Sequence, residues 1–227
     1  MSSPDESRRT MDIKQIEAIL PHRNPFLLID RILDFEPGVA VVGLKAVTMN
    51  EEYFKGHFPG HPVMPGVLIT ESMAQVAGVL LLSMDGNEGK LAYFTGIDKQ
   101  RFRKPVVPGD LLVTRVEVIA SRGSVGKVRA ESFIFRLETS NFGTAAPHPV
   151  SRPAEGTNPG LAATNAGPDA ATETRLPVAR NHISCVTESD GRRERKLYIG
   201  VMEGELAAEG ELTFALVDRA ERPPQTA

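Results

Sequence analysis

The sequence VLITESMAQVAGVLLLSM, residues Val67–Met84, is apolar nearly all the way round when it is drawn as a helix. It is long enough for about five turns at 3.6 residues per turn. A helix without a broad polar face must be buried on most of its sides. We therefore predict one long helix inside the fold, covered by the other elements of the chain.

Apolar segments with turn residues between them lie on both sides of this helix and are typical of strands. The predicted strands are 26–35, 39–47, 91–97, 111–120, 124–131 and 211–217. A short amphipathic helix is predicted over Asp12–Leu20, and Pro21 ends it. Mostly short connections between strands, with one buried helix, predict an α+β fold in which a sheet packs one face on the helix.

The composition excludes several classes of protein. The net charge is only −3, which does not favour nucleic acid or a membrane surface as a partner. Cys185 is the one cysteine, so a disulfide within the chain is impossible and a structural cysteine-based zinc site is not expected. The first residues lack the apolar core of a signal peptide, and no apolar segment is long enough to span a bilayer. We expect a cytoplasmic protein.

The amino-acid composition changes along the chain and predicts one domain that is interrupted by an insert. Residues 1–10 read as a polar tail, and residues 11–132 together with 200–219 read as a single domain. The intervening residues 133–199 are rich in Ala, Pro, Gly, Thr and Asn, which is typical of a disordered insert or a long loop. Residues 220–227 read as a second tail.

His57 is the first candidate for chemistry. It lies in KGHFPGHPVMPG, Lys55–Gly66, where prolines and glycines restrict or specialise the backbone. Such a loop can hold an imidazole in place as a general base. The alternative is an ordinary surface histidine. His61 and His22 have no evident carboxylate partner in the sequence, and Pro59 and Gly60 argue against a helix that presents His57 and His61 to a metal.

Glu71 is the second candidate, because it is a carboxylate in an otherwise apolar helix. If it is buried, loss of hydration raises its pKa and favours the protonated acid, which can act as a general acid. The alternative is a narrow polar stripe with Thr70 and Gln75, in which Gln75 simply hydrogen-bonds Glu71 one turn away.

Gly66 follows Pro65 at the start of the predicted long helix. Free N–H groups at a helix N-terminus stabilise negative charge, so they suit a thioester carbonyl that becomes enolate-like. Glycine also lets a substrate approach the backbone closely. The alternative is an ordinary helix start, for which a Pro-Gly pair is common.

Five segments together resemble the FabZ-type dehydratases of fatty-acid synthesis. The segments are LPHRNPFLLIDR at 20–31, GHFPGHPVMPGVL at 56–68, ESMAQ at 71–75, FTGID at 94–98 and RFRKPVVPGD at 101–110. The large departure from the family pattern is the insert of about 65 residues before the return strand near 205–217. Long insertions between strand ends cost little closure entropy, so the core can tolerate this one.

The resemblance implies a hot-dog fold, in which a curved antiparallel sheet wraps one long central helix. It implies dehydration of a (3R)-3-hydroxyacyl thioester on acyl carrier protein, with His57 as base, Glu71 from a second subunit at the departing hydroxyl, and the Gly66 N–H at the thioester carbonyl. Phe58 and Gln75 are further expected substrate-binding residues. A homodimer that assembles into a trimer of dimers is implied, with no metal and no organic cofactor.

Three alternatives stay open beside this interpretation. A FabA-type dehydratase that also isomerises the double bond would carry Asp at the position of Glu71. A hot-dog thioesterase would lack the HFPGHPVMPG loop. A non-catalytic acyl-binding protein, with the insert as its interaction arm, would have no need for both His57 and Glu71.

The sequence KQRFRK contains four cations in six residues: Lys99, Arg101, Arg103 and Lys104. In an extended strand, Lys99, Arg101 and Arg103 would point to one side and Lys104 to the other. Beside the active site they would attract the acidic acyl carrier protein. The alternative is a solvated strand edge, where Lys and Arg discourage aggregation.

Overall fold

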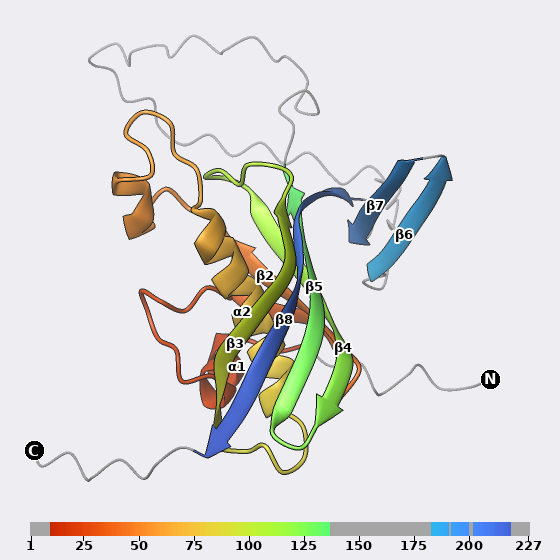
Figure 1. The fold of residues 1–227 in the computed structure, drawn as a ribbon. Coiled ribbons are helices and arrows are strands. Elements are labelled where there is room, and N and C mark those ends of the chain that lie inside the picture. Colours follow the sequence, from red (N-terminus) through yellow and green to blue (C-terminus); the bar gives the residue numbers. More distant parts are fainter. Residues whose placement is uncertain (1–9, 137–182, 191, 200–201, 219–227) are drawn as a thin grey trace, which may run out of the picture. The chain divides into compact units, whose positions relative to one another are not determined.

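Helix α2 (Gly66–Leu82) lies against an eight-stranded antiparallel sheet in the computed structural model, which describes residues 10–136, 183–190, 192–199 and 202–218 (Figure 1). The other helices are α1 (Ile13–Ile19) and the 3-10 helix η1 (Glu52–Lys55). The strands are β1 (Arg31–Glu36), β2 (Ala40–Ala46), β3 (Lys90–Phe102), β4 (Leu111–Arg122), β5 (Val125–Phe135), β6 (Ile183–Asp190), β7 (Arg192–Ile199) and β8 (Met202–Asp218).

The long strand β8 holds the sheet together. The strand order is β1-β2-β4-β5-β8-β7-β6, and β3 also pairs with β8. Glu205 of β8 pairs with Ile134 of β5 and with Lys196 of β7, so β5 and β7 lie on opposite edges of β8. β3 pairs with Ala208–Asp218, farther along the edge that β7 occupies. This arrangement places β3 beside the return strand that the sequence predicted.

The main core lies between α2 and the sheet, because successive strand residues point to opposite faces. Val41, Leu112 and Leu212 point toward the helix and are almost fully buried. Packing is tight where β2 crosses α2. A Cβ added to Gly43 would lie 2.5 Å from Val76 Cγ2, so a side chain at position 43 would push the helix away.

A smaller apolar cluster uses the alternate residues of the same strands. Val42, Val113 and Phe133 pack there with Phe135 and with Leu197 of β7. Leu197 is fully buried, so β7 contributes to the packing of the outer sheet face. The sequence did not predict this contribution, since β7 lies in the region interpreted as an insert.

The predicted α+β fold with one buried helix and a curved antiparallel sheet is confirmed. α1 also forms where expected, with Asp12 as its N-cap accepting the Gln15 N–H at 3.0 Å. One predicted strand is shorter than expected, because β1 begins only at Arg31. Backbone groups of Phe26 and Leu28 bind side chains of α2 instead of a neighbouring strand.

The predicted domain boundaries differ from the strand ends. β5 continues past position 132 to Phe135, and β6 and β7 occupy 183–190 and 192–199, within the predicted insert. Residues 137–182 and 191 of that insert lie outside the described residues, as do 1–9 and 219–227, which hold nearly all of the two predicted tails.

Within the described ranges, no helix combines the length and the apolar character that a membrane crossing requires.

Candidate active site

The loop Gly56–Pro65, called the His57 loop below, is anchored at both ends. At its start, the His57 N–H donates to the Tyr53 carbonyl of η1 at 3.0 Å. In its second half, the Val63 N–H donates to the His57 carbonyl at 3.0 Å, and the Met64 N–H donates to the Val106 carbonyl at 2.8 Å. These backbone bonds hold the imidazole in a defined position, as the prolines and glycines of the loop predicted.

The His57 ring is oriented by one strong hydrogen bond. Nδ1 lies 2.6 Å from the Val63 carbonyl oxygen. Because a carbonyl oxygen can only accept, Nδ1 carries the proton, and in the neutral imidazole Nε2 then holds the free lone pair. The Phe58 ring stacks on the imidazole with centroids 3.9 Å apart. The ring is therefore prepared to accept a proton at Nε2.

His57 borders a cavity of about 330 Å³. Most of its other walls are apolar, and two cations stand among them. The lining residues are His57, Val63, Met64, Gly66, Ile69, Phe102, Arg103, Lys104, Pro105 and Val106. Of the residues predicted from the sequence, the cavity thus brings together His57, Gly66, Arg103 and Lys104.

Gly66 opens α2 at the cavity wall. Pro65 is the N-cap and provides no side-chain hydrogen bond. Among the described residues no acceptor is found for the Gly66 N–H, so it is free for a ligand. A Cβ at Gly66 would lie 3.0 Å from Phe102 Cζ, so glycine leaves just enough space beside this ring. His57, which has a free ring nitrogen, and Gly66, which has a free helix-terminal N–H, therefore line one cavity.

Glu71 lies in a different environment from this cavity. Its side chain is 21% exposed, whereas the helix residues that follow it are almost fully buried. Glu71 Oε1 accepts a hydrogen bond from Gln75 Nε2 at 2.9 Å, as the one-turn spacing predicted. At about 100° per residue, Glu71 is rotated roughly 140° around α2 from Gly66. Within one chain, Glu71 therefore does not line the cavity that His57 and Gly66 share.

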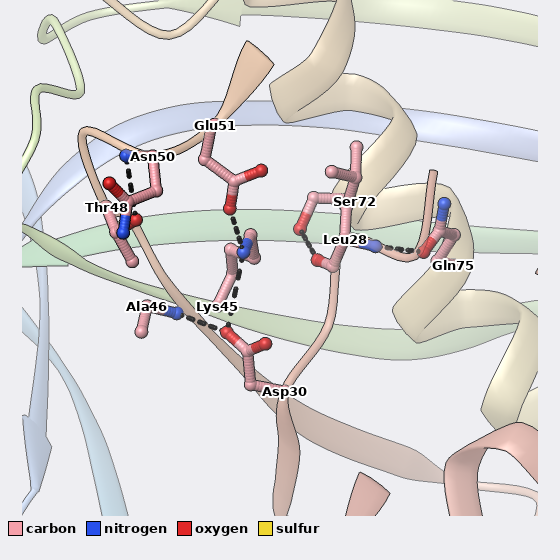
Figure 2. A network of polar contacts seen from close by, with 9 residues as sticks. All are labelled: Leu28, Asp30, Lys45, Ala46, Thr48, Asn50, Glu51, Ser72 and Gln75. Carbon is pink, nitrogen blue, oxygen red and sulfur yellow. Dashed lines mark hydrogen bonds and ion pairs between the residues drawn. The ribbon is translucent and has the colours of Figure 1, made fainter. Parts of the chain in front are cut away.

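Gln75 is almost fully buried, and its amide is used entirely within the chain. Nε2 donates to the Phe26 carbonyl at 2.7 Å as well as to Glu71. Oε1 accepts the Leu28 N–H at 2.7 Å (Figure 2). Both amide hydrogens are therefore committed. Gln75 therefore holds Glu71 within the chain, and its expected contact with the substrate stays a prediction.

His22 is a neighbour of Glu71 that sequence reasoning missed. Its Nε2 lies 3.6 Å from Glu71 Oε1, although no carboxylate partner for it was evident in the sequence. Burial lowers the pKa of His22 from its ordinary value, and the nearby Glu71 carboxylate opposes that shift only in part. Nothing local in the sequence signals this contact, since the two residues are 49 positions apart.

The predicted cation patch is largely neutralised by β8. Lys99 pairs with Glu211 at 2.7 Å, Arg103 pairs with Glu209, and Lys104 pairs with Glu205 at 2.9 Å. The ammonium groups of Lys99 and Lys127 lower the pKa of Glu211 to about 2, so this carboxylate stays ionised. Arg101 is exposed and lies opposite Glu209 in the pairing of β3 with β8, but Glu209 pairs with Arg103, and Arg101 forms no salt bridge with the described residues.

The described part of the chain contains no group of three or more His, Cys, Asp or Glu side chains arranged to hold a metal ion.

Comparison with known proteins places this geometry in a family. The family model described as "FabA-like domain" matches residues 20–135, which run from the end of α1 to the end of β5. A 3-hydroxyacyl-[acyl-carrier-protein] dehydratase FabZ from Desulforamulus reducens is 58% identical over 124 residues, which cover 55% of this chain and 87% of the relative. The FabZ of Pelotomaculum thermopropionicum is 57% identical over 124 residues, covering 55% and 89%. The chain belongs to the FabZ-type dehydratases of the FabA-like family.

Proposed function

We propose that this enzyme removes water from a (3R)-3-hydroxyacyl thioester on acyl carrier protein and forms the trans-2-enoyl thioester, as a step of the elongation cycle of type II fatty-acid synthesis. The observation that supports this reaction most is that His57 and Gly66 line the same cavity, with the Nδ1 atom of His57 bound to the Val63 carbonyl and Nε2 left free. Elimination next to a thioester needs a base at C2 and a donor at the carbonyl oxygen, and this cavity offers both.

Each residue has a distinct proposed role. His57 Nε2 takes the C2 proton while the C3–O bond breaks. The Gly66 N–H stabilises the negative charge that develops on the thioester oxygen, assisted by the positive end of α2. Glu71 orients or protonates the departing 3-hydroxyl, which leaves as water. No metal or organic cofactor takes part in this scheme.

Glu71 is proposed to act in the site of a partner subunit, since it lies around α2 from its own chain's cavity. Features of β3 support pairing with a second copy of this chain. In the described residues, β3 pairs with β8 on one edge and with no strand on the other. Tyr93, Ile97 and Phe102 of β3 are each more than half exposed, although they are large and apolar. We propose a homodimer with two shared sites, and a trimer of dimers as the larger assembly.

The reaction is tested with purified protein and crotonyl thioester, by following the loss of enoyl absorbance as water adds in the reverse direction. We expect steady turnover without added metal. Stoichiometric acyl binding without turnover would favour the acyl-binding alternative, and release of free thiol would reveal a thioesterase. With a ten-carbon hydroxyacyl substrate, a cis-3 product would identify a FabA-type isomerase; we expect only the trans-2 product.

Docking of acyl carrier protein is proposed at the cavity mouth, centred on Arg101. Its neighbours Arg103 and Lys104 line the cavity, and their Glu partners reduce their attraction for an acidic protein. Arg101→Glu should raise KM for the carrier-bound substrate roughly three- to tenfold at low salt and leave turnover of a small carrier-free thioester unchanged.

The matched control for this prediction is Arg122→Glu, the same charge reversal on an exposed residue at the β4–β5 turn. It should leave both substrates unaffected. Equal losses on both substrates in Arg101→Glu would assign Arg101 a structural role, and an unchanged KM for the carrier would place the docking surface elsewhere.

A further inference from the structure

Lys45 is a buried cation that does not line the cavity of the candidate active site. It lies on β2, and its residue exposure is only 6%. Its ammonium group donates to Glu51 Oε1 at 2.5 Å and lies 3.7 Å from Asp30 Oδ2 (Figure 2). Burying an ammonium group is costly unless carboxylates compensate it. On the neighbouring strand β4, the residue paired with Lys45 is the buried Leu112. An apolar side chain at position 45 could pack beside this leucine, so packing alone does not require a lysine there.

The cluster is connected to His57 through η1. Glu51 is the N-cap of η1, and its carbonyl accepts the Phe54 N–H at 3.1 Å. The next connection is the Tyr53 carbonyl, which accepts the N–H groups of Gly56 at 3.3 Å and His57 at 3.0 Å. Glu51 lies only six positions before His57, so a displacement of Glu51 would move the backbone that carries the imidazole.

The Tyr53 side chain shows that the region around its hydroxyl group is shielded from solvent. Its hydroxyl is buried, and no hydrogen-bond partner is found for it in the described part of the chain. Burial, and then the carboxylates of Glu51 and Asp30, raise the pKa of the Tyr53 phenol above its ordinary value. The phenol therefore stays neutral and adds no further negative charge. The positive charge near the carboxylates of Glu51 and Asp30 comes from Lys45.

Asp30 connects the cluster to the neighbourhood of Glu71. Its Oδ2 accepts the Ala46 N–H at 2.6 Å, and its own N–H donates to the Leu44 carbonyl at 2.8 Å. Two residues earlier, Leu28 is held to α2 by Gln75 and by Ser72, whose hydroxyl donates to the Leu28 carbonyl at 2.9 Å (Figure 2). Gln75 in turn holds Glu71.

We propose that Lys45, Glu51 and Asp30 form a positioning cluster, in which the buried ammonium group fixes Glu51 and η1 and so holds His57 with Nε2 toward the cavity. The assignment rests on the proposed function of His57. None of the three side chains lines the cavity, so any effect on the reaction would pass through His57, and we call them positioning residues for that reason.

Two neighbouring glutamates on η1 give a matched test. Glu51 binds the buried Lys45, whereas Glu52 forms a salt bridge with Lys55 in which both side chains are about two-thirds exposed or more. Exposed pairs contribute little, so Glu52→Gln should leave kcat and KM unchanged. Glu51→Gln should lower kcat about ten- to hundredfold with KM of a small thioester changed less than twofold, because a misplaced base loses rate before it loses binding.

The position of His57 is measured separately by ¹⁵N NMR of histidine-labelled protein, assigned with a His57→Asn variant. Wild type should show one His57 tautomer, with the proton on Nδ1. Glu51→Gln and Lys45→Met should show exchange between tautomers, whereas Glu52→Gln should resemble wild type. This spectrum does not depend on turnover, so it tests the cluster even if the proposed reaction is wrong.

A double variant tests whether the two groups act as a unit. Lys45→Met with Glu51→Gln should lose no more activity than either single change, because both remove the same link. If Lys45→Met does not fold, Glu51→Gln, whose residue is partly exposed, tests the link alone. Unchanged kcat together with an unchanged His57 spectrum in a folded Glu51→Gln variant would overturn the proposal, even if its thermal stability were lowered.

Discussion

His57→Ala should lower the rate of crotonyl thioester hydration by roughly 10²–10⁴-fold, the usual contribution of a positioned general base. The physical reason is that His57 lines the cavity and its ring is oriented by the bond from Nδ1 to the Val63 carbonyl, which leaves Nε2 to accept the proton. The rate is measured by enoyl absorbance at saturating substrate, and thermal unfolding of the same sample shows whether the loop bond was also needed for stability.

The control for this prediction is His61→Ala, in the same loop. His61 is exposed, and its backbone carbonyl, not its ring, accepts the Phe58 N–H. Its removal should leave the rate near wild type. A His57→Ala enzyme with a near wild-type hydration rate would contradict the mechanism, whatever the result for His61.

Glu71→Gln should cause a loss of similar size, because the amide keeps the volume of the side chain but neither carries the charge of the carboxylate nor donates an acidic proton. The bond to Gln75 can survive, since the amide oxygen of the new side chain can accept from Gln75 Nε2. We therefore expect a folded protein with a large fall in kcat. A fall in thermal stability that accounts for the lost activity would instead assign Glu71 a structural role.

The same two variants test whether each site is shared between subunits. Co-expression of His57→Ala and Glu71→Gln chains should form mixed dimers in about half of the population at random assembly. Each mixed dimer then holds one site with both residues intact and one site with neither. Activity should therefore recover to about a quarter of wild type. No recovery in isolated mixed dimers would place His57 and Glu71 of one chain in the same site.

Much of the fold was predictable because its signals are local. The apolar character of α2 and the alternation of the strands follow from residues that are near neighbours in the sequence. The same holds for the His57 loop and for Gly66 at the start of α2, where proline and glycine restrict the backbone directly. The family resemblance was local in the same sense, since it rested on short contiguous motifs.

The environment of the candidate residues was not predictable in this way. Nothing near Glu71 in the sequence indicates that His22 lies 3.6 Å away, and nothing near Arg103 indicates that Glu209 of β8 pairs with it. Both contacts depend on which element lies beside which. A charge count along KQRFRK therefore leaves out the glutamates of β8 that pair with three of its four cations.

By itself, then, the sequence determined the class of fold and the buried helix, because these depend on local periodicity and backbone restriction. Its contiguous motifs, through the family resemblance, predicted His57, Glu71 and Gly66 as site residues. Only the tertiary structure decided that Lys45 is a buried cation joined to Glu51, that residues 26–30 bind α2 before β1 begins, and that Glu71 faces away from its own chain's cavity. Burial and pairing depend on contacts between residues far apart in the chain, and a local sequence pattern does not predict such contacts.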